Sequence, residues 1–215
     1  MIAASEPRTD RRRARTRSAL LRAGQSLFAD QSVDAVSIDD IVAAADVAKG
    51  SFYNHFSDKE ALAREIAMAV RAEAEAEIET ANAGVDDPAS RMARAQTVFV
   101  RFARRDPERA RAMMRLFAGA TLPNAPLNRG VRADVEAGLA AGAFRGLTVE
   151  TGVLMAMGAA LVAVTRVLEP GAATSAAALC RGLNFGLLRG LGVDEDQARR
   201  VADAAADDLL QEDRS

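Results

Sequence analysis

Apolar residues recur at three- and four-residue spacing along most of the chain, with charged residues on the positions between them. This period predicts amphipathic helices, and no stretch shows the alternation of apolar and polar residues that is typical of a strand. We expect helices at residues 16–30, 37–45, 49–56, 57–81, 88–105, 107–119, 127–141, 149–168, 172–191 and 195–210. The composition agrees, because the chain lacks Trp and only 4% of its residues are aromatic. The predicted fold class is therefore all-α.

Residues 37–60 predict two short helices joined by a tight turn, followed by the start of a long helix. Ser37 and Asp40 fit a capping box at the start of the first helix. The apolar face of this helix consists of Ile38, Ile41, Val42 and Ala45. After a break near residue 46, Phe52 and Phe56 lie four residues apart on the buried side of the second helix. Ser57 and Glu60 fit another capping box, which would start the long helix. This is the pattern of a helix-turn-helix, whose second helix can enter the major groove of DNA.

The second helix carries polar side chains on its outward face, and these suit a contact with DNA. Lys49 can reach a phosphate or a guanine edge, and Gly50 lets the backbone approach the duplex closely. Lys59 lies in the first turn of the next helix, beside backbone N–H groups that attract phosphate. The predicted DNA-contact residues are Arg17, Ser37, Lys49, Gly50, Ser51, Tyr53, Asn54, His55 and Lys59.

Positive charge is concentrated in the same part of the chain. The formal net charge is −2, yet seven arginines oppose only Glu6 and Asp10 in the first 25 residues, and the two lysines are Lys49 and Lys59. The basic run at 11–17 predicts an arm or a helix start that touches phosphates or reaches the minor groove. A solubilising flank is the alternative. The acidic stretch 203–212 is expected to stay away from DNA.

The chain closely resembles the DNA-binding module of TetR-type bacterial transcriptional regulators. The resemblance rests on Val47-x-Lys49-Gly50, Phe52-Tyr53-x-His55-Phe56 and Ser57-x-Lys59-Glu60-x-Leu62, with Leu20, Ala23, Phe28 and Ile41 in register upstream. It covers about residues 11–71. One departure is Ala48, where the family often carries a Ser or Thr that caps the helix and donates to a phosphate.

The resemblance implies a three-helix DNA-binding domain at 11–71, with its helix-turn-helix at about 37–56, and an effector-binding and dimerisation domain at 85–212. The long helix at 57–81 would join them. It further implies a homodimer that represses by binding a near-palindromic double-stranded DNA operator. A small molecule that enters the C-terminal domain would move the long helix and release the DNA. Activation by a member of the same family is the alternative direction of control.

The C-terminal half predicts a dimer interface and a ligand pocket. The helices at 149–168 and 172–191 are rich in Gly and Ala, which permit close helix approach, and helices in this position form a dimer interface in the family. The predicted interface residues are Gly158, Leu161, Gly182, Phe185 and Gly186, with an ordinary intramolecular core as the alternative. Phe and Met side chains line adaptable apolar cavities, so the predicted pocket residues are Phe99, Phe102, Met113, Phe117 and Met157, unless they are plain core. No charged side chain clearly points into this pocket, and we expect a mainly apolar effector.

Enzymatic chemistry is not predicted. A metal site needs clustered ligands and a nucleophilic triad needs a His base, whereas the single His and the single Cys lie far apart in the sequence. No Gly-rich phosphate loop follows a strand. We therefore expect no metal and no cofactor. A helical adaptor that does not bind DNA explains everything except the polar face at 49–56.

Cys180 and the apolar runs predict the cellular compartment. A lone cysteine forms no intramolecular disulfide and fits a reducing cytoplasm, and its alanine-rich surroundings predict buried packing. The N-terminus lacks the apolar core of a signal peptide, and the longest uncharged run, 151–165, is shorter than the ~20 residues of a membrane helix. We expect a cytoplasmic, nucleoid-associated bacterial protein that does not span a membrane.

Overall fold

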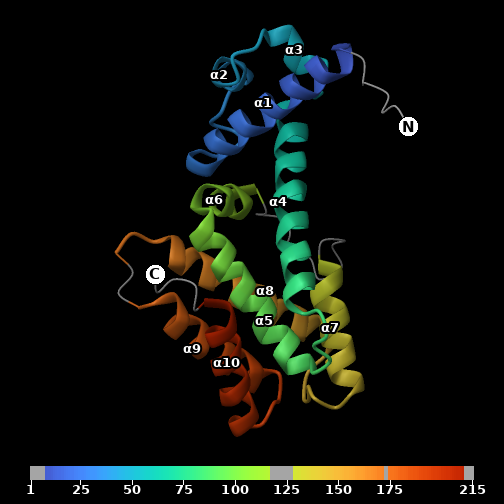
Figure 1. Ribbon diagram of the computed structural model, residues 1–215, viewed down its shortest axis with the longest axis vertical. Helices are drawn as coiled ribbons and strands as arrows, with labels where there is room; N and C mark the ends of the chain where they lie inside the picture. The colour runs from blue at the N-terminus through green and yellow to red at the C-terminus, as the bar shows by residue number, and fades with distance from the viewer. Residues whose placement is uncertain (1–7, 117–127, 172–173, 211–215) are drawn as a thin grey trace, which may run out of the picture.

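The computed structural model describes residues 8–116, 128–171 and 174–210, and all the regular structure in these ranges is helical. Helices α1 to α3 form a small module at the top of Figure 1, α4 runs down from it, and the other helices form a bundle below. The described helices are α1 (Arg8–Asp30), α2 (Ile38–Ala44), α3 (Lys49–Tyr53), α4 (Lys59–Ala81), α5 (Pro88–Arg105), α6 (Pro107–Leu116), α7 (Arg129–Ala140), α8 (Val149–Leu168), α9 (Ala176–Gly190) and α10 (Glu195–Leu210). The all-α prediction is confirmed.

The start of α4 differs from the prediction. The side chain of Asp58 caps this helix, because its Oδ1 accepts a hydrogen bond from the backbone N–H of Ala61 at 2.6 Å. The predicted capping box of Ser57 and Glu60 is therefore wrong, and Ser57 instead donates its hydroxyl to Asp58 at 2.9 Å. A carboxylate suits this position because the first turn of a helix carries unpaired N–H groups and positive charge. These hydrogen bonds, that from Ala61 first, also lower the pKa of Asp58.

Two other helix boundaries in the N-terminal module were predicted wrongly, the start of α1 and the end of α3. α1 begins at Arg8 instead of residue 16, so the basic run at 11–17 lies inside a helix. α3 ends at Tyr53, with Asn54 as its C-cap, instead of continuing to Phe56. Basic residues are good helix formers, and α1 can extend because it packs on α4 and α6.

The C-terminal boundaries agree better with the prediction. α5, α8 and α10 begin and end where the sequence pattern placed them. α9 begins later than residue 172, at Ala176, because Ser175 caps it by accepting from the N–H of Ala178 at 3.2 Å. The predicted helix end at 117–119 lies outside the described residues.

One apolar core runs from the small module into the bundle. Phe28 and Phe52 of the module belong to the same buried cluster as Phe102 of α5 and Val164 of α8. α1 crosses α4 closely at Gly24, where a Cβ atom would lie 2.8 Å from a methyl group of Leu62. The module is therefore packed against the bundle through α4 and α6 as well as joined to it by the chain.

Ion pairs hold the middle of α4 against α5 and α6. Glu73 pairs with Arg109 at 2.5 Å, and Glu77 pairs with Arg105 and, at 3.6 Å, with Arg101. The hydrogen bond from Arg109 lowers the pKa of Glu73. The acidic second half of α4 is thus partly an inter-helix contact.

Candidate nucleic-acid interface and ligand cavity

Local hydrogen bonds start α2, and one residue in the left-handed region turns the chain toward α3. Ser37 caps α2 as predicted: its Oγ accepts from the N–H of Asp40 at 3.1 Å, and Asp40 Oδ2 accepts from the N–H of Ser37 at 2.9 Å. The Ser37 hydroxyl also donates to Asp40 Oδ2 at 2.6 Å, and this bond, followed by the one from the Ser37 N–H, lowers the pKa of Asp40. The chain then turns at Asp46, whose φ of 53° lies in the left-handed region. Ser37 therefore shapes the helix-turn-helix through its capping bond.

α3 buries its aromatic side and presents its polar side outward. Phe52 is fully buried and Phe56 almost so, as the sequence predicted, whereas Tyr53 is 55% exposed and meets the ring of Phe52 edge-on. A Cβ atom at Gly50 would have no neighbour within 4 Å, so the backbone is open on that side. Lys49 is exposed and pairs with Asp39 of α2 at 2.8 Å. As the sequence indicated, α3 lacks a side-chain cap, because its N-cap residue is Ala48.

The basic start of α1 lies beside the end of α3. A shallow hollow there is lined by Arg13 and Arg17 of α1 and by Asn54 and His55. Burial and then the charges of Arg13 and Arg17 lower the pKa of His55, so its imidazole is neutral at pH 7. The structure thus brings together residues that are some 40 positions apart in the sequence.

Two predicted contact residues also have protein partners. Arg17 forms an ion pair with Glu65 of α4, and its guanidinium lies 5.4 Å from the ring centre of Phe56. The ammonium of Lys59 donates to the backbone oxygens of Asp34 at 3.1 Å and Val36 at 2.9 Å. Both side chains therefore stabilise the module through contacts within the protein. The spacing of residues in the sequence did not predict these contacts.

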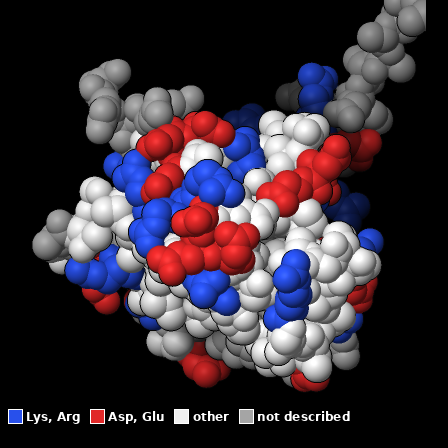
Figure 2. Space-filling model, turned by 90° about the horizontal axis from the view of Figure 1, so that it is seen from below, with Lys and Arg blue, Asp and Glu red and all other residues white. Residues whose placement is uncertain are grey.

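The opposite end of the molecule carries mixed charge. Figure 2 views that end, and the Lys and Arg residues visible on it alternate with Asp and Glu. Ion pairs also join the helices of the bundle, such as Arg94 with Asp208, at 2.9 Å, and Arg181 with Asp203, at 3.6 Å. The excess of arginine over carboxylate in the first residues of the chain is not repeated on this face.

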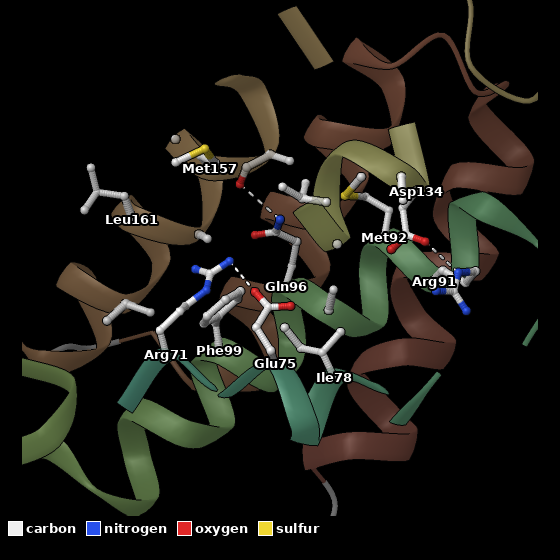
Figure 3. Close-up of a pocket in the computed structure, with 18 of the residues that line it drawn as sticks. Arg71, Glu75, Ile78, Arg91, Met92, Gln96, Phe99, Asp134, Met157 and Leu161 are labelled. Atoms are coloured by element: carbon white, nitrogen blue, oxygen red, sulfur yellow. Dashed lines mark hydrogen bonds and ion pairs between the residues drawn. The ribbon is translucent and has the colours of Figure 1, made fainter. Parts of the chain in front are cut away.

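A cavity of about 470 Å³ lies in the bundle between α4, α5, α6, α7 and α8. Of the predicted pocket residues, Phe99, Met113 and Met157 line it (Figure 3 labels Phe99 and Met157). The prediction of Phe102 is wrong: this ring is fully buried in the apolar core, with the guanidinium of Arg105 5.7 Å from its centre. Phe117 lies outside the described residues.

The cavity also contains charged and polar side chains, which contradicts the prediction of a lining without charge. Arg71 pairs with Glu75, and its guanidinium lies 5.0 Å from the ring centre of Phe99. At the other end, Arg91 pairs with Asp134 at 2.7 Å. Gln96 donates to the backbone oxygen of Ala156 at 3.0 Å. The spacing of Arg71, Glu75 and Ile78 on one face of α4 is the sequence signal that could have indicated them.

The comparisons with known proteins agree with this geometry. The model of the family "bacterial regulatory proteins, tetR family" matches residues 20–66, which span the end of α1 to the start of α4. The HTH-type transcriptional repressor DhaR of Mycobacterium sp. (strain GP1) is 42% identical over 50 residues. Residues 20–66 belong to the TetR family. The aligned segment makes up 23% of this chain and 25% of DhaR, so the chain matches only a quarter of the length of that relative.

Solved structures share the fold of this chain over nearly its whole length. RolR in complex with resorcinol has a TM-score of 0.59 and 23% identity, and the match covers 90% of this chain and 95% of RolR. A TetR-family regulatory protein from Rhodococcus RHA1 has a TM-score of 0.67 and 20% identity, with 83% and 98% of the two chains covered. At these identities the likeness establishes the fold of the whole chain, including the bundle that the family model does not reach.

α8 has an exposed apolar face. Its Leu154, Leu161 and Val162 are 43%, 46% and 58% exposed, and Leu154 and Leu161 also line the cavity. Among the described residues, α8 alone has the length and composition of a membrane-spanning helix, and only 28% of its most apolar stretch is buried. Burying such a face against another protein surface is favourable, because apolar area leaves water.

The glycines of α8 and α9 separate into two groups. Cβ atoms at Gly158, Gly182 and Gly186 would have no neighbour within 4 Å, and all three residues are exposed, although Gly158 also lines the cavity. Gly152 faces inward, where a Cβ atom would lie 2.7 Å from Val135. Phe185, predicted at the same interface, is half-buried and lies under the guanidinium of Arg199 of α10, 4.7 Å from its ring centre.

Proposed function

We propose that this protein is a transcriptional repressor, which binds a near-palindromic DNA operator as a homodimer and is released by a small molecule. The observation that carries this proposal is the outward polar face of α3 beside the arginines of α1, in a segment that matches the TetR family model. In this reading the protein acts on chromosomal DNA in the bacterial cytoplasm.

The DNA contacts follow from the exposure of the side chains. Lys49, Gly50, Ser51 and Tyr53 lie on α3, and Asn54 and His55 follow at its end, where a base edge or a phosphate is within reach. The ammonium of Lys59 has three N–H groups and donates two to carbonyl oxygens, which leaves one for a phosphate. Ser37 and Arg17 contribute mainly by holding α2 and α1 in place.

The homodimer would bury the outer faces of α8 and α9. These faces hold Leu161, Gly158, Gly182 and Gly186, four of the five residues predicted at the interface, and the exposed edge of Phe185 lies on α9 beside them. Two copies related by a two-fold axis would place two α3 helices on successive major grooves of one operator.

The cavity is the proposed effector site. Its volume of about 470 Å³ is within the range of ligand pockets, roughly 300–1,000 Å³. It is walled by α4, which begins at the DNA-binding module, and by α6, which packs on α1. The structurally similar RolR was solved with resorcinol, which supports a small-molecule ligand for this fold.

DNase footprinting of the purified protein on the DNA upstream of its own gene tests the proposal. We expect a protected near-palindrome, and Tyr53→Phe should weaken binding by the loss of one phosphate hydrogen bond per subunit. Lys59→Ala should reduce the slope of log affinity against log salt by about 2 for a dimer. Because Lys59 also holds the chain between α1 and α2, its variant is compared at equal helicity by circular dichroism.

A helical adaptor without DNA binding is the second candidate. It predicts no footprint. Any residual DNA affinity should then depend on salt with the same slope of log affinity against log salt in the wild type and in Lys59→Ala. An activator of the same family would give a footprint but raise transcription in a reporter assay, and so would change only the direction of control. The TetR family match favours a regulator over an enzyme, and the described residues contain no group of three metal-ligating side chains.

A further inference from the structure

The side chains that line the cavity define what kind of ligand it can hold. This inference rests on the proposed effector role of the cavity. Its walls are mainly apolar, and Ile78, Met92, Phe99 and Met157 surround three polar side chains, Arg71, Glu75 and Gln96 (Figure 3).

The charges in the cavity are matched within the protein. Arg71 pairs with Glu75, with 17% and 28% of their side chains exposed, and Arg91 pairs with Asp134. Glu79, the other charged lining residue, is exposed. An anionic ligand would lose its hydration in a cavity whose lining holds more carboxylates than guanidinium groups, and this is unfavourable. The cavity therefore suits an uncharged ligand.

Gln96 supplies a hydrogen-bond acceptor with a fixed orientation. Its Nε2 donates to the backbone oxygen of Ala156, and because a carbonyl oxygen only accepts, this bond decides which end of the amide is nitrogen. The amide oxygen then points the other way, to the side of Arg71 and Glu75 in Figure 3. Gln96 is only 7% exposed, and its Oε1 has no partner among the described residues.

A buried acceptor without a partner favours a ligand that donates a hydrogen bond to it. We propose that the ligand is an uncharged, mainly apolar compound with a hydroxyl group, and that this hydroxyl donates to Gln96 Oε1. The apolar body of the ligand packs against Phe99 and the flexible thioethers of Met92 and Met157, which also make favourable contacts with aromatic rings. Phe99 is held in place by the guanidinium of Arg71.

Isothermal titration calorimetry with a matched pair of probes tests this proposal. 4-Butylphenol and 4-butylanisole have the same apolar body, and the methyl ether lacks the donor. We expect the wild-type protein to bind 4-butylphenol about tenfold more tightly, as one hydrogen bond to a buried acceptor requires. In Gln96→Met, which keeps the side-chain volume, the ratio of the two affinities should fall to about 1.

Thr97→Val is the matched control variant. Thr97 is the next residue on α5, is fully buried, and donates to the backbone oxygen of Ala93 at 2.9 Å, but it does not line the cavity. The substitution removes this bond and also the hydrogen bond that Thr97 Oγ1 accepts from Asn184 Nδ2 at 3.1 Å, yet the preference for 4-butylphenol should persist. The comparison of two ligands on the wild type needs no variant and stands even if Gln96→Met does not fold.

Several results would overturn the proposal. These are failure of 4-butylphenol to bind, equal wild-type affinities for the two probes, or an unchanged preference in Gln96→Met. Tighter binding of the anion 4-butylbenzoate or the cation 4-butylbenzylamine would do the same. Calorimetry contains no DNA, so its outcome is independent of repression. If 4-butylphenol binds as expected but leaves operator affinity unchanged, the effector role is wrong while the ligand chemistry stands.

Discussion

At the scale of single residues, Asp46 stores strain in the turn between α2 and α3. Its φ of 53° is disfavoured for residues with a side chain and most of all for β-branched ones, and its own side chain is exposed. We predict that Asp46→Val lowers the free energy of unfolding by about 1–2 kcal/mol. Asp46→Asn and Asp46→Gly, whose backbones adopt this conformation more easily, serve as controls. Equal thermal unfolding of all three variants would contradict the strain.

His55 should couple DNA binding to pH. Burial, Arg13 and Arg17 hold its pKa below the ordinary value of 6.5, so the free protein carries a neutral imidazole at pH 7. A DNA phosphate nearby favours the charged form and raises this pKa, so the complex takes up a proton. Operator affinity should therefore increase as the pH falls from about 7 to 5.5, and decrease as it rises.

The pH dependence of His55→Gln provides the control for that titration. Glutamine retains a donor for the phosphate but does not titrate, so the variant should show a flatter profile of fluorescence-anisotropy affinity against pH. Parallel profiles for the wild type and the variant would remove His55 from the interface, whatever their absolute affinities.

At the scale of elements, α6 links the cavity to the DNA-binding module. Met113 and Met114 line the cavity, and Arg115 Nε donates to the backbone oxygen of Ala29, near the end of α1, at 3.0 Å. The family resemblance implies that the long helix carries the coupling between ligand and DNA, and we propose α6 as a second route. A ligand that displaces α6 would pull on α1.

We predict that Arg115→Met reduces the ligand-induced change in operator affinity by about fivefold, the effect of one hydrogen bond, while ligand affinity is retained. Anisotropy titrations of the operator with and without ligand measure the change. Arg111→Met, one turn earlier on the same helix, removes an arginine that does not line the cavity and should leave the change intact. If the ligand changes the operator affinity of Arg115→Met and Arg111→Met by the same factor, α6 does not link the cavity to the DNA-binding module.

At the scale of the whole molecule, the outer faces of α8 and α9 should form the dimer. Because a side chain at Gly182 meets nothing within 4 Å in one protomer, Gly182→Arg should preserve the fold of the protomer. The same change would place a charge in the interface, so light scattering at micromolar concentration should show monomers, and operator binding should be lost.

Two comparisons make the dimer experiment specific. Met68→Arg changes a residue that is 71% exposed on α4, away from this face, and should remain dimeric. Gly158→Arg is a less specific test, because Gly158 also lines the cavity. A wild-type protein that is monomeric under the same conditions would contradict the proposed interface.

The sequence by itself determined the elements whose signals are local. Capping side chains and helical spacing lie within a few residues of each other, so α5, α8 and α10 could be bounded and the Ser37 cap of α2 identified. The inward aromatic side of α3 and the family of the chain followed from one short motif for the same reason. Local signals also misled, since Ser57 fitted a cap that Asp58 provides.

Only the tertiary structure decided which helix faces meet each other. The sequence could not show that Phe102 belongs to the core while Phe99 lines the cavity, because both are apolar residues of one helix and differ only in which neighbour they face. The partners of Lys59 and of Gln96 come from positions 23 to 60 residues away. Such contacts arise from the packing of α4, α5 and α8, and a spacing pattern within one helix carries no information about the helix across from it.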